Sequence, residues 1–265
     1  AIPAALSNEM FHNFTLLHDD IMDSSKKRRG FETVHEKWNV NQAILSGDSM
    51  LIMATEFLDF YDSKIQKDLL KLFNSTALEV CEGQQLDIEF EKKTDIDFDD
   101  YIEMINKKTS VLIASSIKMG GIINQLDSGE LDILYNIGLN LGIAFQIQDD
   151  YLDLFGDEKI IGKKVGQDVV NNKKTALHHL FVNTASEAQL GKYHDYTNIN
   201  NDDEKIEKIK SLFIESDVEK SLKKLVQEYS NNATSAIESL NPKFSKTSDL
   251  ISVSYTHLTL PTKNE

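Results

Sequence analysis

The stretch Phe14-Thr-Leu-Leu-His-Asp-Asp-Ile-Met-Asp23 joins an apolar, helix-forming run to a cluster of three aspartates. On a helix, Asp19 and Asp23 are four residues apart, so their carboxylates project from one face, one turn apart. Like charges at this spacing destabilise a helix, and a hard divalent cation offsets their repulsion well. The spacing therefore indicates a metal-binding helix end.

A second aspartate cluster has the same spacing. Asp149-Asp150-Tyr151-Leu152-Asp153 follows the mostly apolar run Ile143-Ala-Phe-Gln-Ile-Gln148. One such cluster is most simply a solvated acidic patch, but two copies favour metal binding, because charged groups rarely end an apolar stripe unless they are paired or bind metal. If the two helices are antiparallel neighbours, the clusters lie at opposite ends. The metal interpretation requires that the two cluster ends meet across one cavity.

The remaining pattern predicts an all-α protein. Prolines occur only at positions 3, 242 and 261, and apolar residues recur with the helical period of 3.6. We predict long helices over residues 5–24, 37–61, 63–90, 97–119 and 128–154, and shorter helices between 173 and 240. The Lys/Glu-rich stretch 205–224 is most simply a solvated helix face. No repeat, linker or low-complexity block is visible, so we predict a single domain over residues 1–250.

Charge and cysteine content restrict the partners. The chain has 28 basic and 43 acidic residues and a net charge of −15, which disfavours binding to nucleic acid, although metal cations can bridge such a chain to a polyanion. One cysteine, Cys81, excludes an internal disulfide framework. No apolar run reaches the roughly 18 residues that a membrane span needs. We expect no nucleic-acid partner, no membrane span and a cytoplasmic location.

Both ends of the sequence look non-native. The chain begins at Ala1, without Met, inside a predicted helix, which suggests a protein cut at its N-terminus. Residues 251–265 break the helical pattern and resemble the translation of a sequencing adapter. We therefore treat residues 251–265 as a non-native tail and exclude them from the fold.

Basic residues gather near both aspartate clusters. They lie at positions 26–29 after the first cluster, at 107–108 in mid-chain, and at 163–164 and 173–174 after the second cluster. Lys and Arg bind phosphate oxygens directly, whereas carboxylates do so through bridging Mg²⁺. A single basic pair is usually solvated surface, but the ensemble predicts a diphosphate site. Phosphate-loop, zinc-ligand and Ser-His-Asp patterns are missing.

In their order, these motifs resemble those of the trans-isoprenyl diphosphate synthases, the polyprenyl synthetase family, especially its farnesyl and geranylgeranyl members. The resemblance runs from about residue 9 to residue 180. It rests on residues 17–23 with Arg28-Arg29, on Gly83-Gln-Gln-Leu-Asp87, on Lys108-Thr109, on residues 145–153, and on residues 162–173. It implies an isoprenoid synthase helical bundle around a central cavity, and a homodimer. The implied reaction is a Mg²⁺-dependent 1′-4, head-to-tail condensation of isopentenyl diphosphate with an allylic diphosphate, which releases pyrophosphate.

The resemblance also implies a role for each matching residue. About three Mg²⁺ would be held by carboxylates of the two clusters and their neighbours: Asp19, Asp20, Asp23, Asp87, Asp149, Asp150, Asp153 and Asp168. The allylic diphosphate would be held by basic residues: Arg28, Lys108, Lys173 and one of Lys163 and Lys164. Isopentenyl diphosphate would be held by His12 and Arg29. Gln84 would line the first metal site, and Thr109 and Gln146 would direct oxygens at the nascent cation.

Phe14 bears on product length. It precedes Asp19 by five residues, and in the family a bulky ring at this position acts as a floor under the growing chain. Thr15 is small and leaves the floor incomplete, while Phe11 is either a deeper floor or ordinary core. We predict products of C15 to C20.

Three alternatives remain open. A class I terpene cyclase also uses an aspartate-rich motif and Mg²⁺, but its second motif normally contains Asn and Ser. A regulatory subunit of a heteromeric synthase usually lacks one aspartate motif. A purely structural helical bundle needs neither of the two aspartate motifs. The family's upstream Gly-Lys-x-x-Arg-Pro motif is absent from the sequence, so we expect activity of the natural parent protein and leave that of this polypeptide open.

Overall fold

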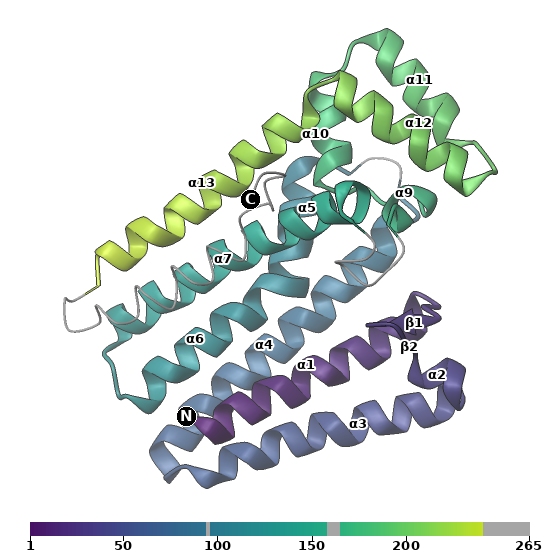
Figure 1. Ribbon diagram of the computed structural model, residues 1–265. Helices are drawn as coiled ribbons and strands as arrows, with labels where there is room; N and C mark the ends of the chain where they lie inside the picture. Colours follow the sequence, from purple (N-terminus) through teal and green to yellow (C-terminus); the bar gives the residue numbers. More distant parts are fainter. Residues whose placement is uncertain (94–95, 158–164, 241–265) are drawn as a thin grey trace. The chain divides into compact units, whose positions relative to one another are not determined.

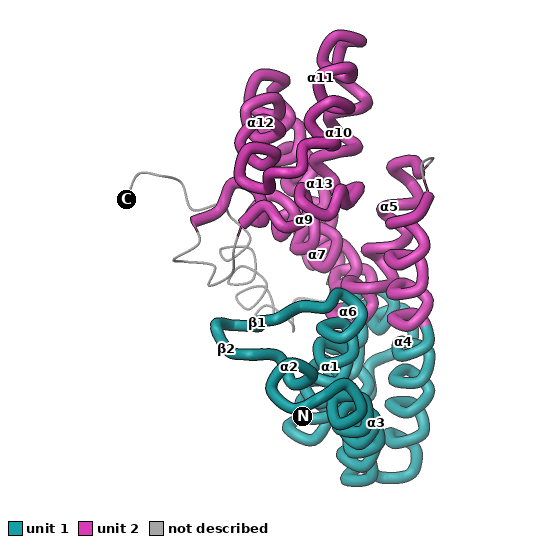
Figure 2. Tube along the Cα trace, turned by 90° about the vertical axis from the view of Figure 1, so that its right-hand side faces the viewer, with its two compact units in different colours: residues 1–78, 114–135 teal, residues 79–113, 136–265 magenta. Residues whose placement is uncertain are grey.

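The computed structural model describes residues 1–93, 96–157 and 165–240 (Figure 1). The chain forms two compact units: unit 1 comprises residues 1–78 and 114–135, and unit 2 comprises residues 79–113 and 136–265 (Figure 2). Three helices run from one unit into the other along the chain: α4 (Ser63–Phe90), α6 (Val111–Ile123) and α7 (Ser128–Phe155).

Unit 1 contains the N-terminal elements. These are α1 (Ile2–Met22), β1 (Lys27–Arg28), β2 (Phe31–Glu32), α2 (Val34–Lys37), α3 (Val40–Glu56) and the short 3₁₀-helix η1 (Phe57–Phe60). The long helix α1 packs along α3. Gly47 on α3 permits this contact, because a Cβ atom there would overlap the ring of His18 on α1.

Unit 2 contains the remaining elements. These are α5 (Phe98–Ile105), the π-helical turn η2 (Asn106–Ser110), α9 (Gln167–Val170), α10 (Ala176–Thr184), α11 (Glu187–Thr197), α12 (Asp202–Glu215) and α13 (Val218–Glu238). Helix α10 packs on α13, and α11 packs on α12. Their shared core contains the rings of Phe181, Tyr193 and Phe213, with centroids 5.2 to 5.9 Å apart.

The all-α prediction is confirmed for the described residues, apart from a ribbon of two strands. Lys27 pairs with Glu32 and Arg28 with Phe31 in an antiparallel hairpin. The predicted helix over 63–90 has those bounds. The predicted helix over 97–119 is divided, because the π-helical turn η2 separates α5 from α6. No described helix is long and apolar enough to cross a membrane.

The prediction that residues 205–224 form a solvated helix face holds for exposed residues such as Glu207, Lys208 and Lys224, but the stretch is divided between two helices and Lys205 does not belong to that face. Helix α12 ends at Glu215, and Asp217, with a φ of 54°, starts α13. Lys205 is buried, and its Nζ donates to Val170 O at 3.0 Å, so α12 holds α9 in place within unit 2. A lysine whose partner is a backbone carbonyl carries no signal in the sequence.

Candidate active site

The first aspartate cluster closes helix α1. Asp23 is the C-cap residue, and Asp19 lies one turn earlier on the same face. The last turn of α1 contains no basic residue, so the aspartates add negative charge where the helix dipole is already negative. This arrangement weakens the helix end and suits a site that binds a cation.

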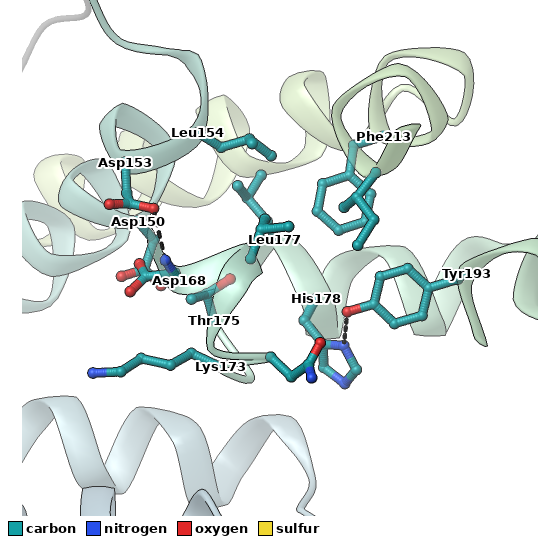
Figure 3. A pocket seen from close by; sticks show the side chains of 13 residues that line it. Asp150, Asp153, Leu154, Asp168, Lys173, Thr175, Leu177, His178, Tyr193 and Phe213 are labelled. Carbon is teal, nitrogen blue, oxygen red and sulfur yellow. Dashed lines mark hydrogen bonds between the residues drawn. The ribbon is translucent and has the colours of Figure 1, made fainter. Parts of the chain in front are cut away.

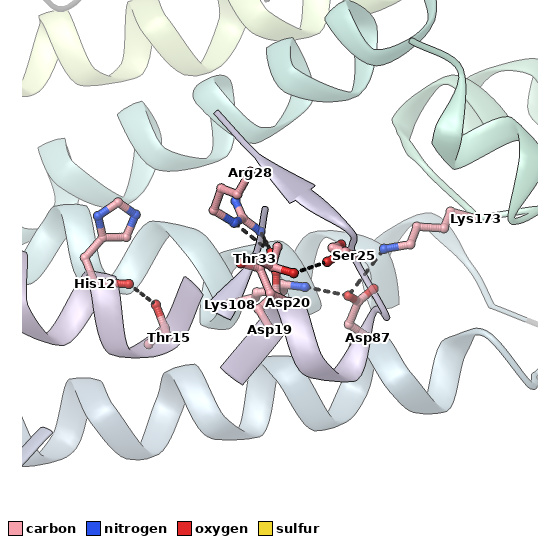
Figure 4. A network of polar contacts seen from close by, with 10 residues as sticks. All are labelled: His12, Thr15, Asp19, Asp20, Ser25, Arg28, Thr33, Asp87, Lys108 and Lys173. Atoms are coloured by element: carbon pink, nitrogen blue, oxygen red, sulfur yellow. Dashed lines mark hydrogen bonds and ion pairs between the residues drawn. The ribbon is translucent and has the colours of Figure 1, made fainter. Parts of the chain in front are cut away.

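Arg28 supplies a cation to this cluster (Figure 4). Its Nη2 atom lies 2.8 Å from Asp20 Oδ1 and 3.6 Å from Asp19 Oδ2, and its Nε donates to Asp20 Oδ1 at 2.8 Å. Burial raises the pKa of Asp20, although the Arg28 guanidinium acts in the opposite direction. Asp20 therefore anchors Arg28 next to Asp19.

The β1–β2 hairpin explains why two adjacent arginines have different surroundings. Arg29 and Gly30 form its two-residue turn, with φ angles of 51° and 83°. Positive φ at both central positions is typical of the tight turns that suit β-hairpins. The turn directs Arg28 back to α1, whereas Arg29 lies exposed at the tip. The two arginines thus present separate cationic groups.

Aromatic rings form a column beneath the first cluster, within unit 1. The Phe14 ring lies 4.7 Å from the His18 ring and 5.6 Å from the Phe11 ring. Phe11 packs edge-to-face on Phe73 of α4 at 5.3 Å. Phe14 and Phe11 were predicted from the sequence, but Phe73 was missed, because its only signal is the apolar periodicity of an ordinary core residue. His12 is half-exposed on α1, 3.9 Å from Glu9.

In unit 2, a second cation–carboxylate group surrounds Asp87 (Figure 4). Lys108 Nζ donates to Asp87 Oδ2 at 2.6 Å, and Lys173 Nζ lies 3.9 Å from the same oxygen. Burial opposes ionisation of Asp87, but the two ammonium groups outweigh it and lower its pKa. The structure thus brings together three residues predicted from separate motifs.

The π-helical turn η2 carries Lys108 and Thr109. Gly83 of α4 faces this turn, and a Cβ atom at Gly83 would overlap the backbone of Lys108. Gly142 of α7 makes a similarly close approach to Ser110. Single π-helical turns inside α-helices are frequent at functional sites. The two glycines explain how this wide turn is accommodated among its neighbours in unit 2.

A hydrogen-bonded chain runs through the second aspartate cluster. Asp150 is 5% exposed. Its Oδ2 accepts from Tyr101 Oη at 2.6 Å and from the backbone N–H of Ala176 at 2.8 Å, and its Oδ1 accepts from Gln146 Nε2 at 3.1 Å. Gln146 Oε1 accepts in turn from Thr109 Oγ1 at 2.9 Å. Burial raises the pKa of Asp150 to about 6, against the effect of these donors.

A small cavity in unit 2 lies beside the same cluster (Figure 3). Its polar wall contains Asp150, Asp153, Asp168 and Lys173, and its apolar wall includes Leu177. The backbone N–H of Asp168 donates to Asp153 Oδ2 at 3.0 Å, and that of Gly166 donates to Asp153 O. Asp153 therefore fixes the segment that carries Asp168.

The donor chemistry of these residues fits Mg²⁺. Within residues 1–93, 96–157 and 165–240, no group of three or more His, Cys, Asp or Glu side chains is arranged to hold a metal ion by itself. Mg²⁺ in phosphate-binding sites is usually held by one or two carboxylates together with substrate oxygens and water. The carboxylates at Asp19, Asp23 and Asp149 are donors of that kind.

Gln84 adds a further sign of a ligand. Its Nε2 atom is buried and has no hydrogen-bond acceptor within the described part of the chain. It lies one turn before Asp87 on α4. A buried donor without an acceptor is costly, and an oxygen-rich ligand would satisfy it. The remaining predicted residues, Lys163 and Lys164, lie outside the described residues.

Comparison with known proteins assigns the class. The family model for Polyprenyl synthetase matches residues 1–215. The chain therefore belongs to the polyprenyl synthetase family, whose members are generally Mg²⁺-dependent. This confirms the resemblance inferred from the motifs.

Individual relatives support the same family assignment. The chain is 41% identical over 177 residues to the short chain isoprenyl diphosphate synthase of Methanocaldococcus jannaschii, covering 66% of this chain and 54% of that protein. It is 42% identical over 192 residues to the geranylgeranyl diphosphate synthase of Saccharolobus solfataricus, covering 71% and 57%. The matches thus span little more than half the length of these curated relatives. A crystal structure of a geranylgeranyl pyrophosphate synthase superposes with a TM-score of 0.91 at 43% identity, covering 97% of this chain and 80% of the other.

Proposed function

We propose that the protein is a trans-prenyltransferase, which joins isopentenyl diphosphate to an allylic diphosphate in 1′-4, head-to-tail linkage and releases pyrophosphate. The observation that carries this proposal is the pair of cation–carboxylate groups, Arg28 on Asp20 and Lys108 with Lys173 on Asp87. In both groups a carboxylate fixes basic side chains that belong to family motifs, and recognition of a diphosphate requires such fixed basic side chains. The names of the relatives, which are synthases of prenyl diphosphates, support the same reaction.

The residues proposed to hold about three Mg²⁺ are carboxylates. Those of the first cluster are Asp19 and Asp23, with Asp20 between them in the sequence, and those in unit 2 are Asp87, Asp149, Asp153 and Asp168. When bound, Mg²⁺ would neutralise the negative charge that develops on the diphosphate leaving group. The lysine side chains would therefore not have to neutralise this charge by themselves.

The chain's own residues would bind and orient the two substrates. Arg28, Lys108 and Lys173, with Lys163 or Lys164, would donate charge-assisted hydrogen bonds to the allylic diphosphate. His12 and Arg29 would serve isopentenyl diphosphate. The allylic C–O bond breaks and its electron pair leaves with the diphosphate. The isopentenyl double bond then attacks the cation, and the released pyrophosphate takes the proton. Thr109 and Gln146 oxygens would stabilise the cation electrostatically.

A labelled condensation assay tests this proposal. The protein, expressed from its complete reading frame, is incubated with Mg²⁺, radiolabelled isopentenyl diphosphate and a C5, C10 or C15 allylic primer. We expect a C15 to C20 product that is lost when a chelator is added. Turnover of the allylic diphosphate alone would instead indicate a terpene cyclase. Mg²⁺-dependent diphosphate binding with no turnover would indicate a regulatory subunit.

Phe14→Ala is expected to lengthen the product by at least one five-carbon unit. The Phe14 ring heads the column formed with Phe11 and Phe73, and its removal opens space below the first aspartate cluster. Chromatographic sizing of products from the C15 primer measures the change. The control is Leu58→Ala, a buried large-to-small substitution in unit 1 outside the column. An unchanged product distribution with Phe14→Ala would contradict the floor.

We also propose that the protein is a homodimer and that α3 contributes to its interface; the cytoplasmic location stays a prediction. Helix α3 exposes large apolar side chains along its length: Val40, Ile44, Leu45, Ile52 and Met53. Large apolar side chains exposed on one helix favour an interaction site, and we propose that a second copy of the chain covers them.

The combined substitutions Leu45→Lys and Ile52→Lys are expected to convert the dimer into a monomer. Two charges would be desolvated at the proposed contact without partners. Light scattering coupled to size exclusion should then show a species with the chain mass of 30.0 kDa instead of twice that mass. Ile214→Lys, at an isolated exposed site on α12, should leave the dimer intact. A monomeric unmodified protein would contradict the proposal.

A further inference from the structure

We propose that Asp150 is a positioning residue, which together with Tyr101 fixes the orientation of Gln146 and Thr109, and that it is not a direct Mg²⁺ ligand. This inference rests on the proposed function and refines the role of one aspartate in the second cluster. It also assigns a task to Tyr101, which belongs to none of the sequence motifs.

The surroundings of Asp150 differ from those of a metal ligand. Its two oxygens accept hydrogen bonds from three protein donors: Tyr101 Oη, the Ala176 N–H and Gln146 Nε2. Asp149, its neighbour on α7, is part-exposed, whereas Asp150 is 5% exposed. The three donors occupy both lone pairs of Oδ2 and one lone pair of Oδ1, so a cation could bind only the single remaining lone pair of a buried oxygen unless it displaced a buried donor, which is strongly disfavoured.

Asp150 also takes the place of an N-cap for α10. The N-cap residue Thr175 makes no side-chain capping hydrogen bond, and the first helical N–H, that of Ala176, donates to Asp150. Helix N-termini have N–H groups without intrahelical partners and favour negative charge. The carboxylate thus fixes the start of α10, directly after the segment that contains Lys173.

The hydrogen-bonded chain has a defined polarity. A carboxylate accepts only, so Gln146 must present its NH₂ group to Asp150 and its oxygen to Thr109. Thr109 must then donate its hydroxyl hydrogen to Gln146, as the 2.9 Å contact has it. The remaining lone pairs of Thr109 Oγ1 and Gln146 Oε1 are then available to electron-poor groups. Asp150 therefore sets which ends of Thr109 and Gln146 carry negative partial charge.

Tyr101 holds Asp150 in this orientation. Its side chain is fully buried on α5, and its ring packs 5.9 Å from Phe98 and 5.5 Å from His179. The hydroxyl therefore has a fixed position, 2.6 Å from Asp150 Oδ2. Removal of that hydroxyl leaves the carboxylate able to rotate and loosens the Gln146 amide.

Tyr101→Phe tests the inference against Tyr193→Phe. Each variant loses one tyrosine hydroxyl hydrogen bond in unit 2, since Tyr193 Oη bonds His178 Nδ1 at 2.9 Å. We expect similar decreases in Tm. We expect kcat to fall about tenfold for Tyr101→Phe only, with the KM values of both substrates within about threefold of wild type, because the loss is confined to the transition state. An equal kcat for the two variants would overturn the inference.

Mg²⁺ binding provides a readout besides activity. In a titration with inorganic pyrophosphate as the probe, the Mg²⁺ midpoint should rise at least about tenfold for Asp149→Asn but less than about threefold for Asp150→Asn. A large rise for Asp150→Asn would show that Asp150 is a ligand and overturn the inference. A wild-type protein with neither turnover nor binding would contradict the proposed function itself, whereas equal kcat values in an active protein would contradict only the role of Tyr101.

Discussion

Asp19→Ala should lower kcat/KM for condensation by about 10³-fold, equivalent to about 4 kcal/mol of transition-state stabilisation, because one carboxylate of the first metal pair is lost. The fold should survive. Asp19 and Asp23 are like charges one turn apart at a helix C-terminus, so the substitution relieves repulsion and replaces aspartate with a better helix former. Steady-state kinetics and thermal unfolding, measured on the same preparation, check both effects.

Asp132→Ala is the matched control for this prediction. Asp132 is an exposed carboxylate in unit 1, paired with Lys118 at 3.0 Å, and surface pairs of this kind contribute little to stability. Its kcat/KM should stay within about twofold of wild type, because it carries no proposed role. If Asp19→Ala lost activity only in proportion to a loss of folded protein, the metal role of Asp19 would be wrong.

Gly83→Ala should destabilise the protein by about 3 kcal/mol and also reduce turnover, because added volume at a tight contact forces backbone shifts. The new Cβ atom would overlap the backbone of Lys108 in η2. Neither α4 nor η2 can yield by rotating a side chain, since the overlapping atoms belong to the backbone. Chemical denaturation measures the free energy of unfolding, and the condensation assay measures turnover.

Gly120→Ala should have the opposite effect on stability. Gly120 lies in α6, and nothing lies within 4 Å of the position that its Cβ atom would occupy. Alanine is favoured over glycine inside a helix, so this variant should gain about 0.5 to 1 kcal/mol. Equal effects of the two substitutions would mean that the contact between Gly83 and Lys108 does not constrain the fold.

The helices were predictable where periodicity and sequence breaks agree. Helix α4 has its predicted bounds because Asp62, directly before Ser63, accepts from the backbone N–H groups of Lys64 and Ile65, and the apolar stripe ends at Phe90. The turn η2 was missed because Lys107-Lys108-Thr109 contains neither Gly nor Pro; the signal lies in Gly83 and Gly142, which are distant in sequence. The hairpin at Arg29-Gly30 was missed because its strands are two residues long, too short to show alternation.

The candidate site could be proposed from the sequence at the level of residue types. Aspartates and lysines that follow apolar runs stand out in a sequence, because charged groups seldom occupy such positions unless they are paired or bind a ligand. Their partners do not stand out: Tyr101 resembles a core aromatic residue and Phe73 a core apolar residue until contacts with Asp150 and Phe11 are seen. Likewise, the grouping of Asp87 with Lys108 and Lys173 depends on the packing within unit 2, which sequence spacing cannot supply.

The most direct measurement is the stoichiometry of pyrophosphate release. The protein is mixed with Mg²⁺, an allylic diphosphate and isopentenyl diphosphate, and phosphorus NMR counts the pyrophosphate while label counts the isopentenyl units incorporated. A head-to-tail condensation predicts one pyrophosphate per unit incorporated, and none when either substrate or Mg²⁺ is omitted. Pyrophosphate released from the allylic diphosphate alone, or no release with both substrates present, would contradict the proposed reaction.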